Sequence, residues 1–181
     1  LQSTVSIINI ALDRGRPRTM GIRQLIDCFI DHRRDVVRRR TEHLLREARK
    51  QAHRLEGLIF AVCDIDEVIA LIRSCRTRED AIVKLMERRF RIAADHPQAS
   101  TIPSLLLEQC NTDDGTALSR VQAEAIGALR LIQLTGLEIE KLVGDYAALI
   151  EKIEEYELLL SDEQRILNII QEDCEEIREA Y

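Results

Sequence analysis

The sequence contains no tryptophan, and its three tyrosines and three phenylalanines make up only 3% of 181 residues. Glu, Arg, Leu, Ile and Ala dominate instead, which is the composition of long helices. With 45% hydrophobic and 32% charged residues, the chain can form a hydrophobic core and is not disordered throughout. The scarcity of aromatic side chains therefore predicts a mainly α protein in which helices pack on helices.

Long apolar runs are also missing. The longest, residues 58–63 (LIFAVC), is far shorter than the roughly 20 residues that a membrane-spanning helix needs. No basic segment followed by an apolar one opens the chain, so no signal peptide is indicated. The five cysteines are scattered without a C-x-x-C pair, which predicts neither a disulfide framework nor a zinc site. We expect no membrane contact and a reducing cytoplasm, and we interpret the chain, which lacks an initiator Met, as part of a longer protein.

Motifs of catalysis are absent as well. The sequence has no Gly-x-Ser-x-Gly elbow, no Walker loop and no dinucleotide fingerprint. The acidic run Asp64–Glu67 (DIDE) has the residue types that Mg²⁺ prefers, but it opens a predicted helix, where acids satisfy free N–H groups and the helix dipole. We therefore predict helix capping there, with no metal site and no catalytic residue in this segment.

Charge is divided unevenly along the chain. Residues 1–90 carry 19 Lys and Arg against 13 Asp and Glu, whereas residues 91–181 carry 7 against 19. Blocks of opposite sign are typical of partner-binding tails or of elements that pair with each other.

The first 20 residues predict a β-hairpin. Thr4–Leu12 is β-branched and roughly alternating, Asp13 to Gly15 supplies a turn, and Pro17–Met20 can return as an edge strand. The run Arg14-Gly15-Arg16-Pro17 is similar to the hooks that enter the DNA minor groove, but those lie in disordered tails. We predict instead a fixed turn whose arginines, Arg14, Arg16 and Arg18, contact at most the phosphate backbone.

Residues 21–63 predict one long helix with a heptad seam. No proline interrupts this segment. With Arg34 and Gln51 filling two positions, its apolar and small residues recur in steps of four and three, which is typical of a coiled coil. The predicted seam of this helix includes Val37, Leu44, Ala48 and Leu55. The arginines of the run HRRDVVRRR, namely Arg33, Arg38, Arg39 and Arg40, point in several directions around the helix, so they can meet either DNA phosphate or an acidic neighbouring helix.

Residues 64–136 predict a small globular helical tip. Asp64 is expected to cap a helix that runs to about Arg73. Thr77 with Asp80 is expected to cap a second helix, to about Phe90. Ser119 with Gln122 is expected to cap a third helix, through Leu134. A short helical turn is expected over residues 103–109. Gly127 and Gly144 lie inside predicted helices, where they are either tolerated or mark a close helix contact.

Residues 137–181 predict the returning helix. Its seam repeats without error through Ile139, Leu142, Tyr146, Leu149, Ile153, Tyr156 and Leu160. Ser161 with Gln164 is expected to cap a continuation. The segment carries 14 acidic and 4 basic residues, opposite to the earlier helix, which favours antiparallel pairing of the two. The predicted fold is therefore a long antiparallel two-helix coiled coil with a helical tip, preceded by a β-hairpin, in the divisions 1–20, 21–63, 64–136 and 137–181.

Two long stretches carry a family resemblance. INIALDRGRPRTMGIRQLIDCFIDHRRDVVRRRTEHLLREARKQAHRLEGL (residues 8–58) and LSRVQAEAIGALRLIQLTGLEIEKL (residues 118–142) resemble the A subunits of bacterial type IIA DNA topoisomerases, foremost DNA gyrase and next its paralogue topoisomerase IV. In that family the first stretch leaves the tower domain and enters a coiled-coil arm, and the second lies near the tip of that arm. Residues 91–117 match no pattern of the family.

The resemblance implies an ATP-dependent type II DNA topoisomerase, an isomerase, in the bacterial cytoplasm. The arms of two protomers would meet at their tips as an exit gate. Implied partners are a second copy of the chain, the gyrase B subunit, which would bind Mg²⁺ and ATP, and double-stranded DNA; no cofactor is implied in this segment. The family's nucleophilic Tyr lies upstream, and Tyr146, Tyr156 and Tyr181 do not match its motif. For the gate contact we predict Leu58, Ile59, Val62, Ile65, Ile69, Ile126 and Leu129.

A different class of protein remains open. Basic antiparallel coiled-coil arms also bind nucleic acid in unrelated proteins, such as some RNA-charging enzymes. That alternative predicts salt-sensitive binding through Arg38, Arg39 and Arg40.

Overall fold

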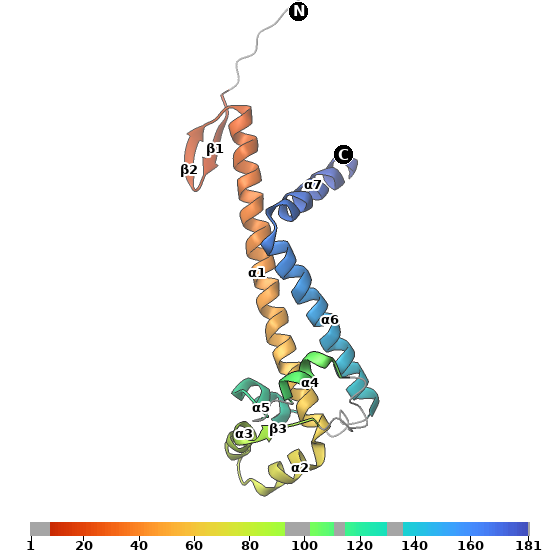
Figure 1. Ribbon diagram of the computed structural model, residues 1–181. Helices are drawn as coiled ribbons and strands as arrows, with labels where there is room; N and C mark the ends of the chain where they lie inside the picture. The colour runs from red at the N-terminus through yellow and green to blue at the C-terminus, as the bar shows by residue number, and fades with distance from the viewer. Residues whose placement is uncertain (1–7, 93–101, 111–114, 130–135, 181) are drawn as a thin grey trace, which may run out of the picture. The chain divides into compact units, whose positions relative to one another are not determined.

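The computed structural model describes residues 8–92, 102–110, 115–129 and 136–180, without the side chains of 105, 109, 110 and 136–139. It is mainly helical, with a two-stranded hairpin followed by long helices, as predicted (Figure 1). The helices are α1 (Ile22–Cys63), α2 (Ile65–Ser74), α3 (Arg78–Glu87), α4 (Ser104–Cys110), α5 (Arg120–Gly127), α6 (Gly136–Ser161) and α7 (Glu163–Ala180). The strands are β1 (Ile10–Asp13), β2 (Arg16–Thr19), β3 (Arg89–Phe90) and β4 (Thr116–Ala117).

The chain divides into two compact units. The hairpin unit comprises the residues up to Leu45 and those from Glu155 onward, and the central unit comprises Arg46–Glu154. Helices α1 and α6 each contribute to both units. The predicted division into the four consecutive segments 1–20, 21–63, 64–136 and 137–181 stays a prediction.

The hairpin prediction is confirmed. β1 and β2 pair antiparallel, with Leu12 opposite Pro17 and Asp13 opposite Arg16. Arg14 (φ 49°) and Gly15 (φ 78°) both adopt the left-handed conformation, as a two-residue hairpin turn of the primed type requires. Ile10 and Leu12 lie on one face of β1 and are exposed.

The buried stripe of α1 differs from the predicted heptad seam. Val37, Thr41, Leu45, Ala48, Ala52 and Ile59 are buried. Leu44, which we placed on the seam, is 38% exposed, and its neighbour Leu45 is buried instead. The stripe takes steps of four, four and three, an 11-residue period of about 3.67 residues per turn, whereas a heptad corresponds to about 3.5 residues per turn. Val37 and Ala48 are one such period apart.

Helix α7 packs on α1 in the hairpin unit. Val37 forms a small apolar cluster with Ile166 and Ile170. The predicted cap of this helix is wrong: the Asp162 carboxylate, not Ser161, accepts the Gln164 N–H (2.9 Å), while the Ser161 hydroxyl donates to the Leu158 carbonyl. Asp precedes the first helical residue, and its short carboxylate reaches the free N–H groups there.

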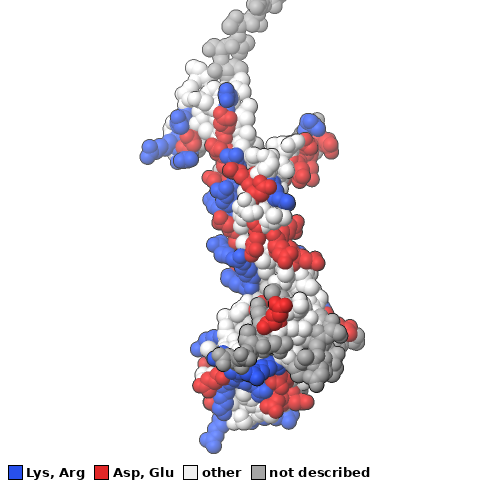
Figure 2. Space-filling model, viewed as in Figure 1, with Lys and Arg blue, Asp and Glu red and all other residues white. Residues whose placement is uncertain are grey.

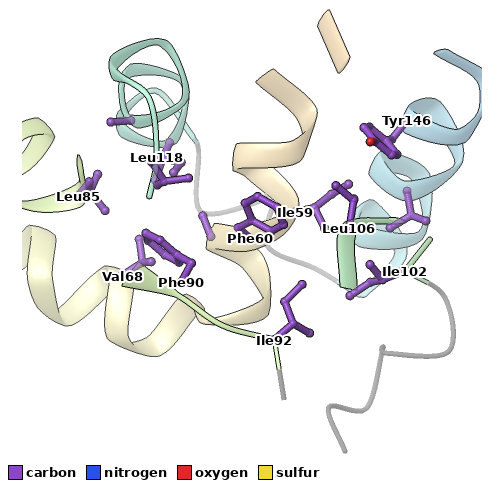
Figure 3. Close-up of a cluster of buried hydrophobic side chains, with 14 of the residues drawn as sticks. Ile59, Phe60, Val68, Leu85, Phe90, Ile92, Ile102, Leu106, Leu118 and Tyr146 are labelled. Carbon is purple, nitrogen blue, oxygen red and sulfur yellow. The ribbon is translucent and has the colours of Figure 1, made fainter. Parts of the chain in front are cut away.

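The main hydrophobic core lies in the central unit. Phe60, Leu85, Phe90 and Leu106 are almost completely buried there, together with Tyr146 (Figure 3). These side chains come from α1, α3, β3, α4 and α6, so the end of α1 is surrounded by helices that are distant in sequence. Of the predicted seam on α6, Tyr146 is buried and Leu142, Leu149 and Ile153 are half-buried against this core. The side chain of Ile139 lies outside the described part.

The predicted caps of the central unit are partly confirmed. The Thr77 hydroxyl accepts the Asp80 N–H (3.2 Å), and Ser119 with Gln122 forms a complete capping box. The Asp64 side chain makes no capping hydrogen bond. It pairs instead with Arg88, which also contacts Glu67 at 3.2 Å, because α2 and the residue after α3 lie side by side.

Two helices of the central unit are shorter than predicted. α3 ends at Glu87 rather than near Phe90, because Arg89 and Phe90 form β3 and pair with β4. α5 ends at Gly127, whereas we expected helix through Leu134. Residues 130–135 lie outside the described part.

Candidate functional site

The hairpin turn presents three of the predicted phosphate contacts. A hollow of about 470 Å³ is lined by Asp13, Arg14, Arg16 and Arg18. Arg18 donates to the Asp13 carboxylate at 2.6 Å. Arg14 and Arg16 are exposed, and neither is paired with a carboxylate among the residues described. Figure 2 shows basic side chains gathered at the hairpin, with few acidic ones beside them.

The arginines of α1 fall into two groups. Arg33 pairs with Asp173 of α7, and the neighbouring Arg34 lies 3.6 Å from Glu163. These contacts join the basic and acidic helices within the hairpin unit. Arg38, Arg39 and Arg40 are exposed, and the Arg39 Nε donates to the Asp35 carbonyl at 3.2 Å. In the part of the chain that the structure covers, Arg38 and Arg40 have no ion pair.

The predicted gate residues do not form one surface. Ile59, Val62 and Ile126 are buried, with exposed fractions of 1%, 5% and 3%, and Ile59 and Ile126 belong to the core of the central unit. A buried side chain offers little surface to a second copy, so these three are weaker candidates for the dimer contact, and their assignment to it stays a prediction. The other four residues line two separate grooves.

The α1–α5–α6 groove has a volume of about 600 Å³. Leu55, Leu58, Leu129 and Leu149 form its apolar part. Its rim carries both signs of charge, with Arg54 and Lys152 on one hand and Asp145 on the other.

The α2–α3–α5 groove has a volume of about 590 Å³. Ile65 and Ile69 from the predicted gate lie along it, beside the buried Val68, Ile82 and Leu85. Its charged lining residues are all basic: Arg73, Arg76 and Arg78, at the end of α2 and the start of α3.

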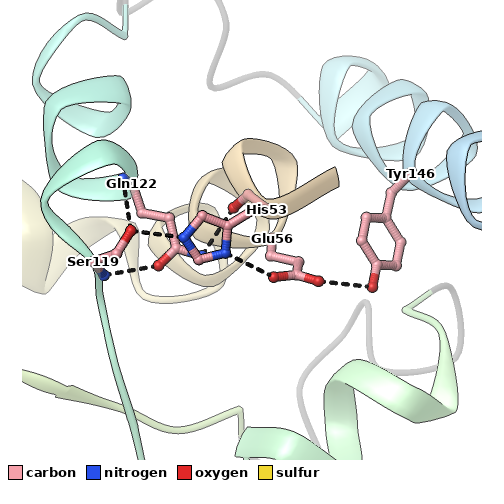
Figure 4. A network of polar contacts seen from close by, with 5 residues as sticks. All are labelled: His53, Glu56, Ser119, Gln122 and Tyr146. Atoms are coloured by element: carbon pink, nitrogen blue, oxygen red, sulfur yellow. Dashed lines mark hydrogen bonds and ion pairs between the residues drawn. The ribbon is translucent and has the colours of Figure 1, made fainter. Parts of the chain in front are cut away.

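A polar network that the sequence did not reveal joins α1 to α5 (Figure 4). The Gln122 amide is buried and donates to the His53 carbonyl at 2.8 Å, and its nitrogen lies 3.3 Å from His53 Nδ1. The Gln122 oxygen accepts the Ser119 N–H at 2.9 Å. On the other side of the ring, His53 Nε2 lies 2.7 Å from the Ser119 hydroxyl.

The network continues to α6 through Glu56. The Tyr146 hydroxyl donates to Glu56 at 3.1 Å, and the other Glu56 oxygen lies 3.5 Å from His53 Nδ1. Burial, and then the charge of Glu56, raise the pKa of Tyr146 well above its ordinary value. The spacing of His53 and Glu56 is visible in the sequence, but their partners come from α5 and α6, nearly 70 and 90 residues along the chain.

Close packing of two backbones holds this network. A Cβ atom on Gly57 would lie 2.6 Å from the Gln122 Cβ, so α5 approaches α1 at this glycine. Gly127 and Gly144, the glycines we had singled out, would meet nothing within 4 Å, which makes tolerance the correct interpretation of both.

The Ser119, His53 and Glu56 side chains superficially resemble a nucleophilic triad. Ser119, however, caps α5 by accepting the Gln122 N–H at 3.3 Å, and His53 Nδ1 faces both the Gln122 amide nitrogen at 3.3 Å and the Glu56 carboxylate at 3.5 Å, rather than a single orienting carboxylate. The network is therefore a structural connection between helices. Over the described ranges, no three His, Cys, Asp or Glu side chains cluster as metal ligands, and no helix is long and apolar enough to cross a membrane.

Comparison with known proteins identifies the family. A family model for the A subunits of DNA gyrase and topoisomerase IV matches residues 1–175. The chain belongs to this family. Similar proteins include the DNA gyrase A subunits of Haemophilus influenzae (37% identical over 185 residues), Aeromonas salmonicida (38% over 188) and Pseudomonas aeruginosa (37% over 188). Each alignment covers 100% of this chain and 20–21% of the relative, so the chain spans about a fifth of the gyrase A subunits it matches.

Proposed function

We propose that the chain is the coiled-coil arm and exit gate of a bacterial DNA gyrase A subunit, which keeps two protomers together while one DNA duplex passes through another. The family match over residues 1–175, with gyrase A subunits among the relatives, carries this proposal. The parent enzyme would be an ATP-dependent type II topoisomerase in the bacterial cytoplasm. Mg²⁺, ATP and the reactive chemistry would belong to the gyrase B subunit or to other parts of the parent chain.

The gate contact that we propose is the α1–α5–α6 groove. It contains Leu58 and Leu129, the predicted gate residues that remain accessible at its apolar lining. A two-fold contact brings the same patch of both copies together, so a self-associating surface must complement itself. Arg54, Lys152 and Asp145 on one rim allow opposite charges to meet across such an axis.

Light scattering of the chain at micromolar concentration tests the gate. We expect a dimer, and Leu129→Glu should convert it to a monomer because a carboxylate would be buried without a partner. Val83→Glu on α3 is the matched control, since Val83 is 48% exposed and lies outside this groove. Circular dichroism checks that both variants fold. A wild-type monomer throughout the concentration range would contradict the gate proposal.

Sequence-independent DNA contact is the second part of the proposal. Arg14, Arg16, Arg38, Arg39 and Arg40 are exposed and have the chemistry to neutralise phosphates. Arg18 and Arg33 already hold carboxylates of the chain, so they are weaker candidates.

The alternative of a nucleic-acid-binding arm is favoured by Arg38 and Arg40, which are exposed and have no ion pair with any residue that the structure describes. It predicts that charge reversal at Arg38, Arg39 and Arg40 abolishes salt-sensitive duplex binding and leaves self-association unchanged. A dimer that persists while duplex affinity stays the same would support the gate alone.

A further inference from the structure

The α2–α3–α5 groove is an apolar surface that the gate proposal does not use. Its floor is made of buried side chains, Val68, Ile82, Leu85 and Ile126. Along its open side lie Ile65 and Ile69, which are half-buried, and Ile72, which is 37% exposed. At one end Gly127 leaves open space where another residue would place a Cβ. The groove therefore offers a mostly apolar lining to a partner.

The charge around this groove has one sign. Arg73, Arg76 and Arg78 are exposed, and no acidic residue in the described ranges pairs with any of them. The nearby acids are engaged elsewhere: Glu79 pairs with Arg120 at 3.1 Å, and Asp80 with Lys84 at 3.7 Å. The positive potential of the rim is therefore not neutralised from within the described part of the chain.

This charge pattern argues against a second copy in the groove. A two-fold contact through it would set three arginines of one copy against the same three of the other, and like charges that face each other across an interface repel. Nucleic acid would use the arginines but would gain nothing from an isoleucine-lined floor. A helix with apolar residues on one face and carboxylates on its flanks matches both features.

We propose that the α2–α3–α5 groove binds an acidic amphipathic helix of another protein. The apolar face of that helix lies on Ile65, Ile69 and Ile72, and its flanking carboxylates pair with Arg73, Arg76 and Arg78. This interaction is independent of the gate contact, because the two grooves share only Leu129.

Fluorescence anisotropy tests the proposal with a labelled synthetic helix of Leu, Glu and Ala, leucines on one face and glutamates on its flanks. We expect saturable binding to the full chain that weakens as salt is added. Replacing all three arginines, Arg73→Gln, Arg76→Gln and Arg78→Gln, should weaken binding about tenfold, since exposed ion pairs each contribute modestly and their effects accumulate over three pairs. Ile72→Asp should weaken binding by a similar factor.

Matched controls locate the binding. Arg38→Gln with Arg40→Gln removes two exposed arginines of the hairpin unit and should leave the affinity unchanged. A probe with Gln in place of Glu should bind more weakly. The proposal is overturned if the acidic probe does not bind, or if the triple variant binds it as tightly as wild type. It is also overturned if Ile72→Asp shifts the dimer toward monomer, or if a short DNA duplex binds through the arginines regardless of Ile72.

Discussion

Gly57 and Gln122 lie at the closest approach of α1 and α5. In Gly57→Ala the new methyl group would overlap the Cβ and Cγ of Gln122, at 2.6 and 2.7 Å, and the Gln122 amide is held by hydrogen bonds at both its oxygen and its nitrogen. Overpacking costs typically about 1–3 kcal/mol, which exceeds the helix-propensity gain of about 1 kcal/mol. We expect a net decrease in the free energy of unfolding, measured by urea denaturation.

Gly144→Ala is the matched control for that change. Gly144 also lies inside a helix, but a Cβ there meets nothing within 4 Å. Alanine should therefore stabilise the chain by up to about 1 kcal/mol. Equal effects of the two substitutions would show that the approach at Gly57 is not tight.

Tyr146→Phe removes the hydroxyl that donates to Glu56. Leaving a half-buried carboxylate short of one donor should cost about 1–2 kcal/mol at neutral pH. The folded-state pKa of Tyr146 is raised, so the unfolded chain releases this proton first as the solution becomes alkaline. The Tyr contribution is thus complete below about pH 10 and falls above it. The difference in stability between wild type and Tyr146→Phe, followed across about pH 8 to 11, should shrink in the alkaline part of that range; a constant difference would contradict this.

The residue network could be predicted only in part. Ser119 and Gln122 lie three residues apart and predict a capping box, and that prediction is confirmed. The attachment of Gln122 to His53, and of Tyr146 to Glu56, depends on helices that meet through tertiary packing, and no local pattern encodes such a meeting. The heptad spacing of the returning helix was the one indirect signal, since it placed Tyr146 on the predicted seam and the structure buries that side chain.

The start of α7 shows how element boundaries are fixed by single side chains. Asp162→Ala removes the carboxylate that accepts the Gln164 N–H and should cost about 0.5–2 kcal/mol. Ser161→Ala should cost less, because the Ser161 hydroxyl donates back to the Leu158 carbonyl and caps nothing at α7. Thermal unfolding of both variants checks the order. A larger loss of stability from Ser161→Ala than from Asp162→Ala would instead support Ser161 as the cap, as the sequence predicted.

Helix existence followed well from the sequence, whereas helix faces and ends did not. α1 begins at Ile22, as predicted, and it continues without a break because no proline or glycine interrupts the run before Gly57. The heptad pattern favoured Leu44 over Leu45 because two adjacent leucines satisfy either period, and only the packing partner decides between them. The end of α3 was missed because β3 and β4 are two residues each, too short to show any alternation.

At the scale of the whole chain, the two units differ in the size of their cores. Among the described residues, the hairpin unit buries Val37, Ile166 and Ile170 in its apolar cluster, whereas the central unit buries a much larger set around Phe60 and Leu85. Amides near Val37 and Ile166 should therefore exchange with solvent at least about tenfold faster than those near Phe60. Hydrogen exchange measured by mass spectrometry tests this, and uniform protection along α1 would contradict it.

The sequence predicted how many basic and acidic residues each half of the chain carries, but not which of them form ion pairs. Basic and acidic helices do meet, through Arg33 and Asp173 and through Arg34 and Glu163. Other arginines of the same run, Arg38 and Arg40, remain outside any pair within the described residues. Composition counts charges without regard to the face on which each one lies, so it could not separate helix-pairing arginines from those left for a partner.

The buried stripe of α1 also constrains how this helix can change in length during evolution. Inserting or deleting 11 residues returns every later side chain to its original face and moves it by about 16 Å along the axis. A single inserted residue would instead rotate everything beyond it by about 100° and expose the stripe that begins at Val37. Relatives with longer or shorter versions of this helix should therefore differ by residue numbers that complete roughly whole turns, such as about 7, 11 or 18, so that the length of α1 varies in discrete steps.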